Sequence, residues 1–198
     1  MSNLSVERRW QPLAVAAVTI TQYSFRAFSI AWHRTPTRRD AWPMSNLPKP
    51  SFRLLYDCEL QAQAPIVIGE TPQGRRRVIE ITGGWFDGPN MSGEVLPGGS
   101  DWQLIRSDGV VSLESRYMLK TGDGAIIFVY NRGVRVAEPD ISARLDDGEE
   151  VDPNLYRFRT TPTFETGASD YLWLNNVVAV ATAARRPRSA EIAVFEVL

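Results

Sequence analysis

The sequence predicts an all-β protein, built as a single antiparallel β-barrel of about nine or ten strands with one short helix. Three observations favour this fold class. From Ser51 onward, apolar and polar residues alternate with a period of two, as in strands that bury one face. Asp-Gly pairs separate neighbouring strands, as in tight hairpins. The run Ile81–Trp102 is rich in glycine and contains two prolines, which favours tight turns and excludes a helix.

Two strands of this pattern are the clearest. Phe52–Leu60 alternates along its length, with Leu55 as the one residue out of phase. Val111–Leu119 alternates in the same way and has Arg116 on its polar face. Further strands are expected at Arg75–Thr82, Gly93–Leu96, Trp102–Ser107, Ala125–Asn131, Tyr156–Thr160, Leu174–Thr182 and Glu191–Val197.

The turns and the helix follow from local chemistry. Asp108-Gly109 and Asp123-Gly124 supply residues that tolerate a positive φ, so each predicts a hairpin turn. Only Glu138–Val151 has helical character, with Asp140 as the expected N-cap.

So many antiparallel strands must close on themselves or stack as two sheets, because open sheet edges invite association. We expect a closed barrel. A sandwich remains the alternative, since periodicity does not separate the two. A barrel of about eight or more strands encloses a pocket lined by alternate residues of each strand, so polar residues on inward faces become candidates for a site.

The chain divides into residues 1–43 and a barrel domain over residues 44–198. The first segment lacks glycine and has a net charge of +4, whereas the second has 16 basic and 21 acidic residues. MSNL occurs at Met1–Leu4 and again at Met44–Leu47, so Met44 is one candidate for the true start. A targeting segment, an interfacial amphipathic segment and a disordered extension are the alternatives.

Composition narrows the chemistry. A net charge of −1 offers no field for nucleic acid, and the longest uncharged stretch is too short to span a membrane. The single cysteine, Cys58, favours a reducing compartment, so the cytoplasm is expected. The one histidine, His33, precedes the barrel domain, which therefore lacks the parts for Ser-His-Asp catalysis and for the usual zinc or iron sites. We expect no metal and no cofactor.

Carboxylate, arginine, tyrosine and amide groups remain, a set that suits acid–base work on a carbonyl, hydroxyl or enol. Asp101 and Glu165 are the candidate catalytic residues: Asp101 follows a tight Gly-Gly loop, and Glu165 follows a proline in an apolar setting. Ordinary structural roles, as a turn cap and an ion-pair partner, are the alternatives. The candidate ligand-binding residues are Arg116, Tyr171, Asn175 and Glu80.

The segment Lys49–Leu198 resembles, nearly end to end, the family called domain of unknown function 3237, an uncharacterised protein family of small β-barrels. The matching blocks are GETPQGRRRVIEITGG at Gly69–Gly84, GEVLPGGSDW at Gly93–Trp102, RYMLKTGDGAIIFVYNRG at Arg116–Gly133, RTTPTFETG at Arg159–Gly167 and YLWLNN at Tyr171–Asn176. The resemblance implies a lipocalin-like or allene-oxide-cyclase-like barrel with a central cavity, and a homo-oligomer. It implies no agreed activity.

Two functions therefore stand side by side. One is a cofactor-independent lyase, isomerase or cyclase that acts on a small oxygenated organic molecule in the barrel cavity. The other is a non-catalytic barrel that binds a small-molecule ligand with the same groups. For either function, Asp101, Arg116, Glu165 and Asn175 are expected to converge on one cavity.

Overall fold

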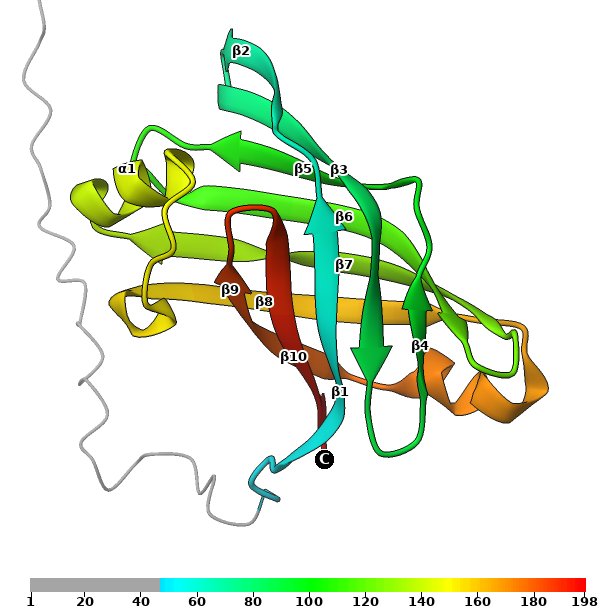
Figure 1. Ribbon diagram of the computed structural model, residues 1–198. Helices are drawn as coiled ribbons and strands as arrows, with labels where there is room; N and C mark the ends of the chain where they lie inside the picture. Colours follow the sequence, from blue (N-terminus) through cyan, green and yellow to red (C-terminus); the bar gives the residue numbers. More distant parts are fainter. Residues whose placement is uncertain (1–46) are drawn as a thin grey trace, which may run out of the picture. The chain divides into compact units, whose positions relative to one another are not determined.

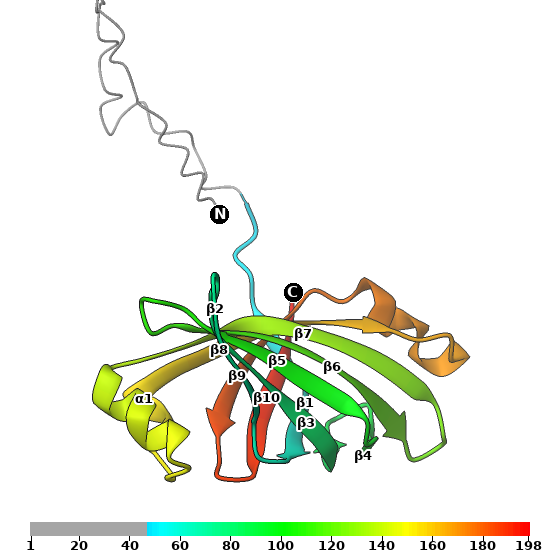
Figure 2. The same ribbon diagram turned by 90° about the horizontal axis from the view of Figure 1, so that it is seen from above.

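The computed structural model describes residues 47–198, which form one ten-stranded antiparallel sheet closed into a barrel (Figures 1 and 2). Eight strands form the ring in the order β1, β10, β9, β8, β7, β6, β5 and β3, and β3 closes it against β1. The two extra strands are β2, which projects beyond the ring with the start of β3, and β4, which shares with β5 the place between β3 and β6. The predicted barrel is confirmed, and the sandwich alternative is wrong.

The elements have the following bounds: β1 Phe52–Ala62, β2 Ile66–Thr71, β3 Gly74–Asp87, β4 Ser92–Val95, β5 Gly99–Ile105, β6 Val111–Thr121, β7 Ile126–Ala137, α1 Pro139–Asp146, η2 Pro153–Leu155, β8 Tyr156–Glu165, η3 Ser169–Asn176, β9 Ala179–Arg185 and β10 Ser189–Val197. No helix among them is both long and apolar enough to cross a membrane. The interpretations of residues 1–43 lie outside the described part of the chain.

Alternation of side chains builds the barrel wall. In β6 every second residue from Val111 to Thr121 is buried, and β8 alternates strictly between buried and exposed residues. β1 departs from this rule at Leu55, where the register against β10 shifts and two successive residues are buried. Leu55, the residue out of phase in the sequence, therefore lies in a β-bulge.

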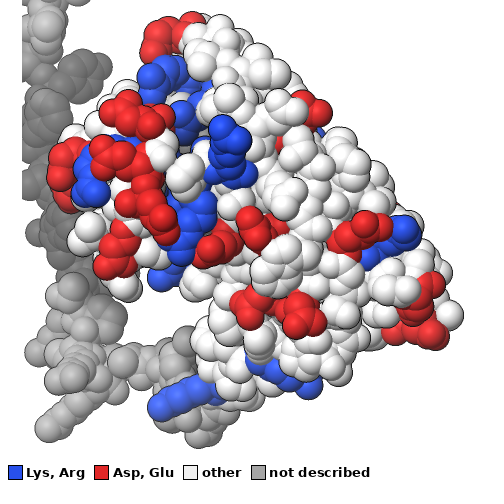
Figure 3. Space-filling view, viewed as in Figure 1, with Lys and Arg blue, Asp and Glu red and all other residues white. Residues whose placement is uncertain are grey.

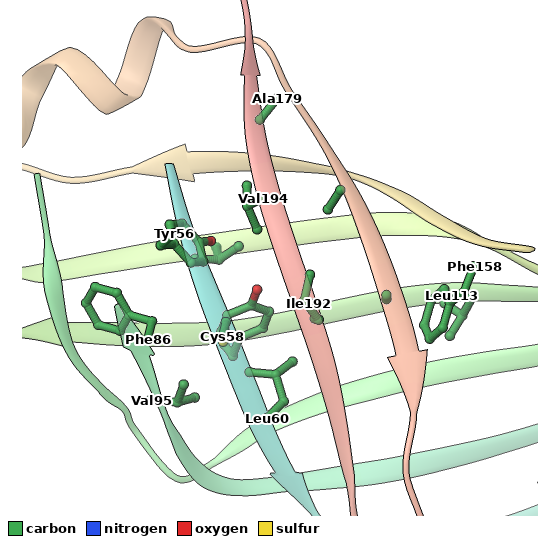
Figure 4. Packing of buried hydrophobic residues seen from close by; sticks show 14 of the residues in the cluster. Tyr56, Cys58, Leu60, Phe86, Val95, Leu113, Phe158, Ala179, Ile192 and Val194 are labelled. Carbon is green, nitrogen blue, oxygen red and sulfur yellow. The ribbon is translucent and has the colours of Figure 1, made fainter. Parts of the chain in front are cut away.

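The interior contains a continuous apolar core. Cys58 and Leu60 of β1 lie beside Ile192 and Val194 of β10 (Figure 4). Tyr56 packs edge-on against Phe86, with ring centroids 5.7 Å apart and planes at 70°. This core joins the inner faces of the strands.

Both predicted hairpins are confirmed. Gly109, between β5 and β6, has φ 80°, and Gly124, between β6 and β7, has φ 92°. These angles lie in the left-handed region that glycine adopts at little cost. The Asp-Gly pairs thus set where both connections turn.

Three elements differ from the expectations. The helix covers Pro139–Asp146 rather than Glu138–Val151, and its N-cap is Glu138 rather than Asp140. The block YLWLNN forms the 3₁₀ helix η3 instead of beginning a strand, because only Leu174 of this block is buried and alternation is absent. β2 was not expected, since its apolar residues are consecutive and exposed.

One glycine contact can be tested with a matched pair. Gly84 has φ 139° and lies opposite Leu60, and an added Cβ would overlap the carbonyl oxygen of Glu59. Gly69 also has a positive φ of 112°, but its surroundings are open. We expect Gly84→Ala to destabilise the barrel by about 1–3 kcal/mol more than Gly69→Ala does, since only the first adds steric overlap to backbone strain. Thermal melts of both variants measure this; equal losses would contradict it.

Candidate functional site

A cavity of about 50 Å³ lies inside the barrel, beside the hairpin that joins β9 to β10. Its apolar lining residues are Leu60, Ile79, Ile81, Leu113, Phe158 and Ile192. Its polar lining residues are Asp101, Gln103, Ser115, Asn131, Arg135, Thr160 and Arg185. A small space that is lined by apolar groups and by a few convergent polar groups is typical of a ligand site.

Asp101 is the acidic group of this cavity. It extends from β5, where its register partners are Ile79 of β3 and Ser115 of β6. Ser115 Oγ donates a hydrogen bond to Asp101 Oδ1 at 2.8 Å, and Gln103 Nε2 donates to Oδ2 at 2.6 Å. Burial raises the pKa of Asp101, and these two hydrogen bonds, with the charges of Arg77 and Arg135, only partly oppose this effect. Asp101 therefore keeps its proton to a higher pH than an exposed aspartate.

Ser115 allows this carboxyl group to exist in two states. A hydroxyl can donate a hydrogen bond or accept one, whereas the amide nitrogen of Gln103 can only donate. When Asp101 is ionised, both neighbours donate to it. When Asp101 is protonated, its own O–H can donate to Ser115 Oγ after the hydroxyl rotates. The hydrogen bonding of the site thus tolerates gain and loss of one proton.

A network of arginines continues from Gln103 to helix α1. Arg77 Nε donates to Gln103 Oε1 at 2.8 Å, and Arg77 Nη2 lies 3.0 Å from Asp146 Oδ1. Arg135 Nη2 reaches the same oxygen at 3.3 Å, and the exposed Arg75 reaches Asp146 Oδ2 at 3.2 Å. Asp146 therefore forms ion pairs with three guanidinium groups. Figure 3 shows acidic and basic side chains side by side over this part of the molecule.

Several polar atoms around the cavity lack partners. Arg135 Nε, Asn131 Oδ1 and Thr160 Oγ1 are buried and have no hydrogen-bond partner among residues 47–198. An unpaired buried polar group is costly, so such atoms usually face a ligand or an ordered water molecule. These three unpaired atoms belong to residues that line one cavity, which makes the cavity the candidate site.

Asp101 is the only sequence-predicted site residue that the structure places in the cavity. Arg116 lies on the outer face of β6, where it pairs with Glu114 Oε1 at 2.8 Å and stacks over Tyr130. It borders an outer hollow of about 630 Å³. Glu165 and Glu80 are exposed on the outer faces of β8 and β3. The strands that contain these residues direct the opposite parity of side chains inward.

Tyr171 and Asn175 lie on η3, and they have structural partners. Tyr171 Oη donates to Asp123 Oδ2 at 3.2 Å. Asn175 Oδ1 accepts from the backbone N–H of Thr166 at 2.9 Å, and its Nδ2 donates to the backbone oxygen of Thr166 at 3.0 Å. These contacts fix the connection between β8 and β9. The expectation that Asp101, Arg116, Glu165 and Asn175 converge on one cavity is therefore wrong.

The structure adds residues that the sequence reasoning did not select. Arg77 lies in the run Arg75-Arg76-Arg77, and its side chain is buried beside Gln103. Alternation offers a signal here, because Arg77 has the parity of the buried Ile79 and Ile81. Asn131 likewise continues the buried series of Ile127 and Val129. The only cue for Arg185 is its place at the end of an apolar strand.

The raised pKa of Asp101 predicts how stability changes with pH. Below the pKa of an aspartate in the unfolded chain, about 3.9, the carboxyl group is neutral in both states. As pH rises toward the higher folded-state pKa, the unfolded chain ionises more readily, so the wild type loses stability. The melting temperature of Asp101→Asn, measured relative to the wild type from about pH 4 to about pH 8, should therefore rise.

Asp108→Asn is the matched control for this measurement. Asp108 lies in the turn before β6. Desolvation raises its pKa, but the hydrogen bonds from Val110 and Arg106, together with the Arg106 charge, outweigh this effect and lower the pKa. Its contribution has the opposite sign, so that variant should lose stability relative to the wild type as pH rises from about 2 to about 4 and should change little further up to about pH 8. A pH-independent difference for Asp101→Asn would contradict the assignment of a raised pKa.

Comparison with known proteins identifies the family of this barrel. The family described as "Protein of unknown function (DUF3237)" matches residues 50–197. The chain belongs to this family. Among curated DUF3237 relatives, a UPF0311 protein of Clostridium acetobutylicum is 36% identical over 155 residues, which cover 78% of this chain and 98% of the relative. A UPF0311 protein of Rhodopseudomonas palustris is 43% identical over 130 residues, or 66% of this chain and 85% of the relative. The resemblance stated from the sequence is confirmed.

Solved structures agree with the DUF3237 assignment. A crystal structure of a conserved Rhodopseudomonas palustris protein matches with a TM-score of 0.73 and 37% identity, over 77% of this chain and all of the other. A β-barrel-like protein of Acinetobacter baumannii matches with a TM-score of 0.68 and 35% identity, over 77% of this chain and 99% of the other. A hydroalkoxylation enzyme of Penicillium herquei is a more distant relative, 26% identical over 133 residues, which cover 67% of this chain and 74% of the enzyme.

Proposed function

We propose that the barrel is a cofactor-independent enzyme of the lyase, isomerase or cyclase type, which uses Asp101 for proton transfer to and from a small oxygenated organic molecule. The observation that carries this proposal is the buried carboxyl group of Asp101, which faces a cavity and has a neighbour, Ser115, able to accept or donate. Burial raises the pKa of this carboxyl group, and a carboxyl group with a raised pKa is suited to act as acid and base in one cycle.

The relationship to the hydroalkoxylation enzyme of Penicillium herquei supports this reaction class. Hydroalkoxylation adds the O–H of an alcohol or phenol across a C=C bond. The O–H bond breaks, a C–O bond forms, and the electron pair of the double bond takes a proton at the other carbon. The reaction needs proton transfer and no change of oxidation state overall. Side chains of the kind that line this cavity are sufficient for such chemistry.

In the proposed reaction, Asp101 as carboxylate takes the proton of the substrate hydroxyl while the oxygen attacks the double bond. The protonated Asp101 then delivers a proton to the carbon that has become electron-rich. When the double bond is conjugated with a carbonyl group, negative charge develops on the carbonyl oxygen. Arg135 lines the cavity and its Nε is unpaired, so its guanidinium group is placed to stabilise that charge.

A non-catalytic binding barrel is the second candidate, and it has its own observation. The unpaired atoms of Asn131, Thr160 and Arg135 would be satisfied by a ligand that undergoes no reaction. Under this alternative, removal of the Asp101 carboxylate changes affinity and no turnover exists.

The two candidates are separated by a direct assay. Short-chain hydroxy-enones, such as 7-hydroxyhept-3-en-2-one, match the small cavity better than aromatic substrates; they are incubated with the full chain, and ring closure to a tetrahydrofuran is followed by loss of the enone absorbance. Turnover above the uncatalysed rate that disappears in Asp101→Asn supports the enzyme. Saturable binding of such compounds without ring closure or its reversal supports the binding barrel instead.

A further inference from the structure

We propose that the ligand of the cavity is a small organic monocarboxylate whose carboxylate group pairs with Arg135 and Arg185. The inference rests on the proposed use of the cavity as the substrate site, and it adds the charge and size class of the substrate.

Guanidinium groups outnumber carboxylates around the cavity. Arg135 and Arg185 line the cavity, and Arg77 donates a hydrogen bond to the lining residue Gln103. The carboxyl groups whose charges act on Arg185 are those of Asp101 and Asp146. Arg77 and Arg135 share Asp146. Three guanidinium groups therefore face at most two negative charges, and a single one when Asp101 is protonated. Buried charge without compensation is unfavourable, so the cavity favours an anion.

Several hydrogen-bond donors that line the cavity have no acidic partner in the described part of the chain. Among residues 47–198, Arg185 forms no ion pair; its Nη1 donates to the backbone oxygens of Ser189, at 3.0 Å, and Arg186. The Arg135 side chain is only 2% exposed, and its Nε has no acceptor. Thr160 Oγ1 adds a second unpaired donor. A carboxylate, with two oxygens and about four acceptor sites, matches such a set of donors.

The volume of the cavity limits the size of the ligand. A volume of about 50 Å³ holds a carboxylate and a short carbon chain, but not a ligand of the usual drug size, which needs about 300 Å³ or more. Ile79, Ile81 and Leu113 form an apolar surface against which such a chain can pack. On the side of the β9–β10 hairpin, Ala62 and Ala190 are small and leave room for the chain to enter.

The test compares a carboxylate with its neutral isostere. Butyrate and butyramide have nearly the same shape and differ in charge, and their binding to the full chain is measured by calorimetry. We expect saturable binding of butyrate at least about tenfold tighter than of butyramide, which corresponds to about 1.4 kcal/mol. Equal affinities, or no saturable binding of butyrate, would overturn the proposal.

Variants assign the binding to the cavity. Arg135→Gln should weaken butyrate binding at least about tenfold. Arg132→Gln is the matched control, because Arg132 is exposed on the outer face of the same strand, and it should leave the affinity unchanged. If Arg135→Gln does not fold, Arg185→Gln replaces it, with the same expected loss. Unchanged affinity in the folded variant would overturn the assignment.

Asp101→Asn separates this inference from the proposed function. If ring closure of a neutral hydroxy-enone depends on Asp101 but butyrate does not bind, the monocarboxylate class is wrong and the enzyme stands. If butyrate binds in an Arg135-dependent manner but no probe is turned over, the enzyme is wrong and the anion site stands.

Discussion

Replacing Asp101 with asparagine should lower turnover by about 10²–10⁴-fold, the range that one positioned acid or base contributes to a reaction. The substitution keeps the size of the side chain and one acceptor oxygen. It removes the group that can release and recover a proton between Ser115 and Gln103. The loss should therefore appear in kcat, whereas KM and the affinity for a non-reacting ligand change much less.

Asp57→Asn provides the matched control, since it makes the same chemical change at an exposed position on the outer face of β1. Its kcat should stay within about twofold of the wild-type value. Rates are compared at equal concentrations of folded protein, verified by melting curves. Full activity in a folded Asp101→Asn variant would remove Asp101 from the reaction and leave the binding barrel as the function.

Replacing Asp146 with asparagine should cause a large loss of stability, about 2–4 kcal/mol, which lowers the melting temperature by roughly 5–15 °C for a domain of this size. Arg77 and Arg135 have side chains that are 11% and 2% exposed, and Asp146 is their one carboxylate partner within residues 47–198. The variant leaves two buried guanidinium groups without a counter-charge. Because the Asp146 side chain keeps 27% exposure, we place the loss below that of a fully buried pair.

Asp147→Asn tests whether the partner, rather than the helix end, matters. Asp147 is exposed and follows Asp146 directly at the end of α1. Its substitution should change stability by less than about 0.5 kcal/mol. Similar melting temperatures for the two variants would show that the arginines do not depend on Asp146.

The sequence predicts the barrel well because each strand of the barrel wall has one face in water and one face in the interior. A wall that is wet outside and apolar inside forces the alternation seen in β6 and β8, and the Asp-Gly pairs mark two of the turns. β2 escapes this reasoning because Ile66, Val67 and Ile68 are all exposed, so no buried face imposes a period. The 3₁₀ helix η3 escapes it because its apolar residues cap a connection instead of lining the wall.

The candidate site is harder to predict because the residues with the most reactive side chains are not always those that face the interior. In β6, alternation places Ser115 inside with Leu113 and Tyr117, and it places Arg116 outside. A choice of site residues by reactivity alone favours Arg116, although Ser115 is the residue that contacts Asp101. The convergence of Asp101, Arg135 and Arg185 depends on the closure of the ring, which brings together β5, β7 and β9. No local pattern contains that information.

Ring closure also has a consequence for the newly synthesised chain. β1 lies between β3 and β10, so one edge of the first strand of the barrel pairs with the last strand of the barrel. Until β10 emerges, β1 and β9 each present a row of free backbone N–H and C=O groups, which can pair with strands of other chains. Translation that stops before Ser189 therefore releases an open sheet. The chain is most exposed to association with other chains in the interval before β10 is made.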